Sequence, residues 1–107
     1  NVKNFVFVTT DVHFTMNIAY QIDANGDGDL LTFHEFVTGP LNAIMLAPPT
    51  SLDPTLNPTI LYSEGPLFNF GFVQVHEMAD GKAHLLADVR DVAGVQRPGS
   101  VVDLTPQ

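Results

Sequence analysis

The sequence predicts an α+β domain, and three stretches carry that prediction. Residues 5–8, F-V-F-V, are apolar without alternation, which is typical of a strand buried on both faces. Residues 32–38, T-F-H-E-F-V-T, predict a short helix, because Thr32 and Glu35 have the spacing of a capping box. Residues 68–104 hold three strand-like segments separated by turns, which predicts a terminal antiparallel meander.

The composition limits the possible classes of protein. A length of 107 residues fits one domain. The formal net charge is −8 with only four Lys and Arg, which argues against nucleic acid or an anionic membrane as a partner held by charge. The chain has no cysteine, so disulfides and thiolate metal sites are excluded. No stretch reaches the roughly 18 apolar residues of a membrane span, and we expect no transmembrane segment.

The first strand, expected over residues 4–9, leads into a pair of polar residues. Asp11 and His13 follow its carboxyl end, separated by one residue. In open α/β sheets, ligands bind in the crevice beyond the carboxyl ends of the strands. Carboxylate and imidazole are the usual ligands of zinc, iron and manganese. We therefore predict that both residues are metal ligands, with a surface aspartate and a partly buried histidine as the alternative.

Residues 23–29, D-A-N-G-D-G-D, match the first seven positions of an EF-hand calcium loop. The match fails at position 12, where His34 replaces the expected glutamate and Glu35 comes one residue late. We therefore expect a looser calcium site, with a polar turn that binds nothing tightly as the alternative. The predicted calcium ligands are Asp23, Asn25, Asp27, Asp29 and Glu35.

The rest of the chain gives weaker signals. Residues 14–22 are compatible with either a short helix or an irregular extended segment. Residues 47–66 are rich in proline and predict a long surface loop or an arm over a neighbour. A hairpin turn is expected at residues 79–82, which places His76 and His84 in its two arms as packing partners. One unit is expected, made of a strand with both candidate loops (1–46), the proline-rich arm (47–66) and the meander (67–107).

Four motifs, taken together, resemble a known enzyme family. They are F-V-T-T-D-V-H-F (7–14), E-F-V-T-G-P-L-N-A (35–43), L-D-P-T (52–55) and F-N-F-G-F-V-Q-V (68–75). In this order they resemble the C-terminal part of PhoD-like metallophosphatases, which are alkaline phosphatases and phosphodiesterases of the calcineurin-like superfamily. The resemblance covers essentially the whole chain.

The resemblance implies a four-layer α/β/β/α sandwich with a dinuclear transition-metal site of iron, zinc or manganese, besides any calcium. Asp11 and His13 fall on the last metal motif of the family, G-D-x-H, with Thr10 in place of the glycine. The other ligands would lie in an N-terminal part. We therefore expect the chain to be a C-terminal fragment or processed chain that is inactive alone, and we assign it no catalytic residue.

The resemblance also implies what the complete enzyme does. It would hydrolyse phosphomonoesters or phosphodiesters with a metal-activated water, and it would be secreted or periplasmic. Two alternatives stay open. One is a phospholipase D-type phosphodiesterase of the same family. The other, from a different class of protein, is a non-catalytic calcium-binding structural module.

Overall fold

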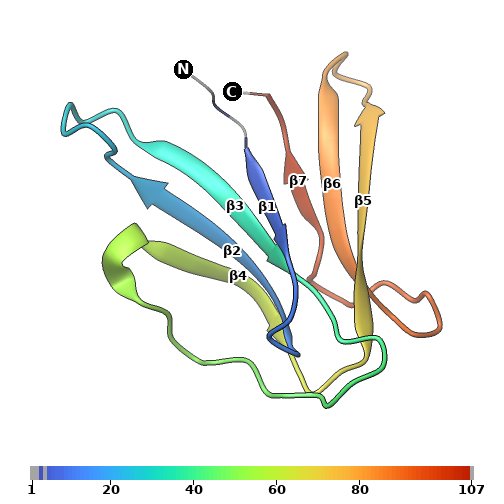
Figure 1. Ribbon diagram of the computed structural model, residues 1–107. Coiled ribbons are helices and arrows are strands. Elements are labelled where there is room, and N and C mark those ends of the chain that lie inside the picture. The colour runs from blue at the N-terminus through green and yellow to red at the C-terminus, as the bar shows by residue number, and fades with distance from the viewer. Residues whose placement is uncertain (1–2, 4, 107) are drawn as a thin grey trace.

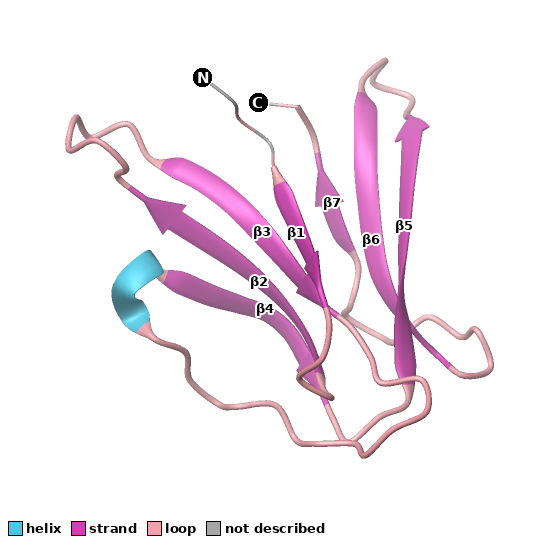
Figure 2. Ribbon diagram, viewed as in Figure 1, coloured by secondary structure: helices cyan, strands magenta, loops and turns pink. Residues whose placement is uncertain are grey.

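The computed structural model describes residue 3 and residues 5–106, and these form two β-sheets (Figures 1 and 2). The first sheet has four strands in the order β1-β3-β2-β4, and the second has three in the order β5-β6-β7. The elements are β1 (Val6–Thr9), β2 (Thr15–Ile22), β3 (Leu31–Val37), the single-turn 3-10 helix η1 (Pro54–Leu56), β4 (Pro58–Glu64), β5 (Asn69–Glu77), β6 (Ala83–Asp91) and β7 (Val102–Leu104).

The predicted α+β class, with its four-layer α/β/β/α sandwich, is wrong, because the described residues contain no α-helix and form two β-sheets. The segment expected to be a short helix at residues 32–38 lies in β3, hydrogen-bonded between β1 and β2. Residues 14–22, which were open between helix and extended chain, form β2 almost entirely. Pairing on both edges of β3 outweighs the weak local preference that a capping-box spacing provides.

Two of the three strand pairings in the four-stranded sheet join strands that are not consecutive in the chain, and only β2 and β3 form a hairpin. β1 pairs with β3 in parallel, from Val6 with His34 to Thr9 with Val37. β2 is antiparallel to both β3 and β4. β4 comes from the segment expected to be an irregular proline-rich arm, and that expectation is corrected for residues 58–64. Pro58 is the first residue of this edge strand, where its missing N–H removes no central ladder bond.

The second sheet confirms the predicted antiparallel meander. β5 pairs with β6 through the expected hairpin, and β6 pairs with β7. His76 and His84 lie directly opposite each other in the two arms of that hairpin. Each strand contacts the next one in the chain, so local turns bring the whole sheet together.

Two apolar clusters lie on opposite faces of the four-stranded sheet. Phe36 on β3 packs against Ala87 and Val102 of the meander and so joins the two sheets. The adjacent Val37 points the other way, as alternate strand residues do, and packs with Met16 and Ile18. Polar bonds also link the sheets: Asn17 Nδ2 donates to the carbonyl of Ser100 at 2.7 Å, and the guanidinium of Arg97 donates twice to Glu64.

β1 differs from the predicted strand buried on both faces. It is an edge strand among the described residues, paired only with β3. Phe7 is 50% exposed and Val8 is 63% exposed. The sequence pattern of an interior strand is therefore present without the neighbours that such a strand requires. In the described part of the chain, no helix has the length and apolar character needed to cross a membrane.

Candidate metal-ligand loop

Asp11 and His13 lie on the loop that follows the carboxyl end of β1 and turns into β2. Their backbones adopt positive φ angles, 80° at Asp11 and 63° at His13. Such angles are uncommon for residues other than glycine, although Asp and His are enriched among the exceptions. Two strained residues within three positions indicate that the surrounding contacts hold the loop in a specific shape.

Three hydrogen bonds hold this loop against the segment that follows β3. The N–H of Thr38 donates to the carbonyl of Thr9 at 3.1 Å, and the N–H of Leu46 donates to the carbonyl of His13 at 2.8 Å. The third bond joins the His13 ring to the chain, because Nδ1 lies 2.7 Å from the carbonyl oxygen of Ile44. The loop is therefore tied down on both sides of Asp11.

The bond to Ile44 defines the tautomer of the neutral His13 ring. A carbonyl oxygen only accepts hydrogen bonds, so Nδ1 must carry the proton. In the neutral ring, Nε2 then carries the lone pair. A histidine that ligates a metal through one nitrogen usually donates from the other to a carbonyl or carboxylate. The Nε2 atom of neutral His13 is therefore available to bind a metal ion through its lone pair.

Thr10, which stands where the family pattern has glycine, is accommodated by Gly39. A Cβ at Gly39 would lie 3.2 Å from Oγ1 of Thr10, tighter than ordinary packing, and Gly39 has a φ of 102°. Both the contact and the angle favour glycine at position 39. The glycine of the E-F-V-T-G-P motif therefore leaves room for the side chain of Thr10 in the ligand loop, residues 10–14 between β1 and β2.

Asn69 holds this Gly39-Pro40 turn in place, and sequence reasoning missed it. Its side chain is fully buried, donates to the carbonyl of Gly39 at 2.9 Å and accepts from the N–H of Gly39 at 2.8 Å. Its own N–H donates to the carbonyl of Pro40. Two residues on, a Cβ at Gly71 would lie 2.7 Å from Cγ2 of Thr38. The F-N-F-G motif contains both residues that support the turn: Asn69, whose buried amide bonds to Gly39, and Gly71, which leaves no room for a Cβ beside Thr38.

Four of the five predicted calcium ligands lie in a single loop, and the fifth, Glu35, lies outside it. Residues 23–29 form the loop of the β2–β3 hairpin, where the Asp23 carboxylate accepts from the N–H of Gly26 at 2.7 Å and of Gly28 at 3.0 Å. The N–H of Asp29, together with the Asn25 amide, lowers the pKa of Asp27. Among residue 3 and residues 5–106, no group of three or more His, Asp or Glu side chains is placed so that it could hold a metal ion.

Glu35 lies away from that loop, in the middle of β3. It pairs with Ile18, four residues before the end of β2. Its carboxylate accepts from the hydroxyl of Thr9 at 2.8 Å and from the hydroxyl of Tyr20 at 2.7 Å. Burial, with the neighbouring carboxylate, raises the pKa of Tyr20 to about 12. Glu35 therefore links β1, β2 and β3 near the start of the ligand loop.

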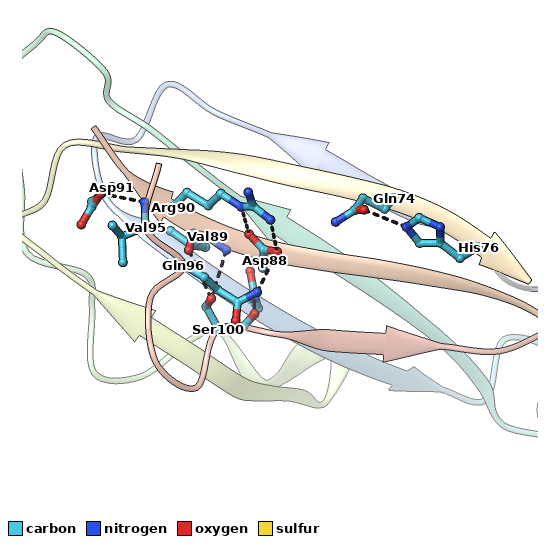
Figure 3. Close-up of polar contacts among 10 residues, drawn as sticks. Gln74, His76, Asp88, Val89, Arg90, Asp91, Val95, Gln96 and Ser100 are labelled. Carbon is cyan, nitrogen blue, oxygen red and sulfur yellow. Dashed lines mark hydrogen bonds and ion pairs between the residues drawn. The ribbon is translucent and has the colours of Figure 1, made fainter. Parts of the chain in front are cut away.

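The meander carries a second polar cluster that the sequence did not indicate, centred on Asp88 (Figure 3). Asp88 is 6% exposed and accepts from Arg90 at 2.9 Å and from Gln96 at 3.0 Å. The Arg90 guanidinium lies 4.0 Å above the Phe72 ring. Burial works to raise the pKa of Asp88, but the bonds from Arg90 and Gln96 outweigh it and lower the pKa. The Asp88 carboxylate is therefore held by hydrogen bonds within the meander, and we assign it a structural role.

Comparison with known proteins leaves the family open. No family model matches the chain, and no curated protein or solved structure matches it significantly. The case for a function therefore rests on the chain's own residues and on the motif resemblance.

Proposed function

We propose that this chain is the C-terminal part of a secreted or periplasmic PhoD-like phosphoesterase, in which Asp11 and His13 are metal ligands. The observation that supports the proposal is the Nδ1–H bond from His13 to the carbonyl of Ile44, which leaves the Nε2 lone pair available for a metal ion. Asp11 lies two residues away on the same constrained loop and supplies an exposed carboxylate.

Metal chemistry suits this donor set. An imidazole nitrogen and a carboxylate oxygen are ligands for iron, zinc or manganese, and such an ion polarises a phosphoryl oxygen and lowers the pKa of a coordinated water. The chain's own contribution is orientation. The positive φ angles and the bonds from Leu46 and Thr38 hold the two donors in place before any ion binds.

The remaining ligands would come from a segment outside these residues. The exposed edge of β1 supports that inference, because its backbone pairs on one side only and Phe7 and Val8 are open to solvent. An unprotected apolar edge strand favours pairing with a further strand. A neighbour there would also lie beside the ligand loop, where the missing donors are needed.

A phospholipase D-type phosphodiesterase is the alternative within the same class. The segment tied to His13 exposes four apolar side chains, and no charged residue occurs between Glu35 and Asp53. An apolar rim favours an ester with apolar substituents over a sugar phosphate. The exposed side chains are Leu41, Ile44, Met45 and Leu46.

The calcium-binding module has less support as a rival. Its loop keeps the predicted order of oxygen donors, but the Asp23 and Asp27 carboxylates accept hydrogen bonds within the loop. Glu35, the expected closing ligand, lies in β3.

The test compares His13→Ala and Asp11→Ala with His76→Ala, all in the full-length protein. His76 is an exposed histidine on the hairpin and serves as the matched control. We expect both ligand-loop variants to lose bound transition metal, measured by elemental analysis, and at least about 100-fold in hydrolysis rate. Their melting temperatures should stay close to that of the control.

The substrates are p-nitrophenyl phosphate and bis(p-nitrophenyl) phosphate, whose rate ratio separates a monoesterase from a diesterase. Near-normal turnover in either ligand-loop variant, or full metal content with full activity, would show that this loop is no part of a metal site. Calcium as the sole bound metal would favour the structural module.

A further inference from the structure

His84 on β6 is hydrogen-bonded at both ring nitrogens. Its Nδ1 lies 2.7 Å from a carboxylate oxygen of Asp103 on β7, and its Nε2 lies 3.0 Å from a carboxylate oxygen of Asp80 in the β5–β6 turn. The His84 side chain is 12% exposed, whereas the two carboxylates are about half exposed. One ring therefore links the hairpin turn to the last strand of the sheet.

The two bonds require a particular protonation state. A carboxylate only accepts, so each ring nitrogen must donate, and only the imidazolium ion has two N–H donors. Asp80, followed by Asp103, raises the pKa of His84. The same contact with His84 lowers the pKa of Asp80. The arrangement is thus an Asp–His–Asp cluster with a single positive charge between two negative ones.

Other titratable and charged groups face this cluster from the elements around it. His76 lies opposite on β5, where its Nε2 lies 2.7 Å from the amide oxygen of Gln74. Glu77 and Lys82 flank the hairpin turn. His34, on β3 of the other sheet, lines a cavity that His84 also lines, and burial lowers its pKa.

That cavity lies between the two sheets at the hairpin end and has a volume of about 240 Å³. Its lining is mostly apolar, with Val6 from the first sheet, Leu85 from β6, and Leu104 and Pro106 from the end of the chain. β7 is the edge strand of the meander and pairs with β6 over only three residues (Figure 1). Val102 of β7 is anchored against Phe36 and Ala87, but the residues that follow, from Leu104 to Pro106, line the cavity, and their local opening would expose it.

We propose that Asp80, His84 and Asp103 form a proton-operated clasp that seats β7 over the intersheet cavity. When His84 is protonated, it donates to both carboxylates and holds the turn and β7 together. When it loses the proton, one donor disappears and two negative carboxylates flank a neutral ring. The clasp is closed below the ordinary histidine pKa, and it opens as the pH rises through the elevated folded-state value.

Hydrogen exchange in the full-length protein tests the clasp, with rates corrected for the intrinsic effect of pH. We expect the protection of residues 100–106 to fall by about fivefold between pH 6 and pH 9, the scale of one exposed ion pair. The edge strand β4 should show no such change. His84→Gln, whose amide has one donor end, should be loose at both pH values, while His76→Gln should keep the wild-type dependence.

The clasp is overturned if β7 keeps the same pH dependence in His84→Gln. If that variant fails to fold, an NMR titration of wild-type His84 decides the question. Loss of the ring proton above the ordinary histidine pKa, together with a shift of the Leu104 amide in the same pH range, supports the clasp. Loss at or below the ordinary value rejects it.

Discussion

The two sheets differ in how their strands find one another. The strands of the meander pair in chain order, with five residues between β5 and β6 and ten between β6 and β7. In the four-stranded sheet, β1 pairs with β3 in parallel and β4 pairs with β2, so chain segments that are distant in sequence must meet first. Long-range pairing carries a loop-closure cost that hairpins avoid. The meander is therefore specified locally, while the four-stranded sheet depends on its surroundings.

The sheets also differ in how they use charge and backbone strain. In the meander, Asp88, His84 and Arg97 are each held by partners within the fold. The ligand loop of the other sheet instead combines two positive φ angles with a histidine oriented by the backbone. Strain of this kind persists where the surrounding structure holds it, and it clusters at functional sites. The contrast is consistent with our proposal that the site lies on the four-stranded sheet.

The largest expected effect concerns residues 1–107 produced alone. The side chains of Phe7, Val8, Val73 and Val75 are 45–67% exposed. An apolar side chain left in water forgoes up to about 1.5–3 kcal/mol relative to full burial. We expect aggregation or a molten state, rescued by co-expression with the rest of the protein. A soluble monomer with a sharp cooperative melt in circular dichroism would contradict this and would weaken the contrast between the sheets.

The same contrast explains which parts of the fold were predictable. The meander follows from alternation and turn residues, and the pairing of His76 with His84 follows from the hairpin. β3 was mistaken for a helix because one of its two partners, β1, is separated from it in the chain by β2, and the local capping-box spacing carries no information about either pairing. The positions of Asp11 and His13 after a strand were readable, but the bond from His13 to Ile44 joins residues 31 apart and left no local signal.

A second prediction concerns Asn69, which connects the meander to the ligand loop. Asn69→Ala removes the amide bonds to Gly39 and leaves the partly buried N–H and C=O groups of Gly39 without a side-chain partner. We expect the free energy of unfolding to fall by about 2–3 kcal/mol in urea titrations of the full-length protein. The exposed Asn25→Ala serves as the control and should change stability little. Equal stability of the two variants would show that the Asn69 hydrogen bonds do not stabilise the Gly39-Pro40 turn.

A third prediction uses acid to probe the Asp88 cluster of the meander. Because its folded-state pKa is lowered, Asp88 contributes stability above the ordinary carboxyl pKa, and that contribution is lost as the pH falls through the folded value. Asp88→Asn should therefore cost about 1–2 kcal/mol at pH 6 and less at pH 3. Glu77→Gln, which removes an exposed charge from β5, controls for net charge. A cost for Asp88→Asn that is unchanged at pH 3 would exclude this ion pair as the cause.

The smallest expected effect concerns calcium at the β2–β3 hairpin loop. Three aspartates within seven residues repel one another, so a bound cation should stabilise the hairpin. With a dissociation constant of about 1 mM, 1–10 mM calcium would add about 0.4–1.4 kcal/mol to the free energy of unfolding, or a few degrees to the melting temperature.

Asp23→Ala should abolish the calcium-dependent shift. Glu35→Gln should leave it unchanged, because Glu35 lies in β3 and bonds to Thr9 and Tyr20. A shift that survives in Asp23→Ala, or none at 10 mM calcium, would mean that this loop is a polar turn closed by its own hydrogen bonds.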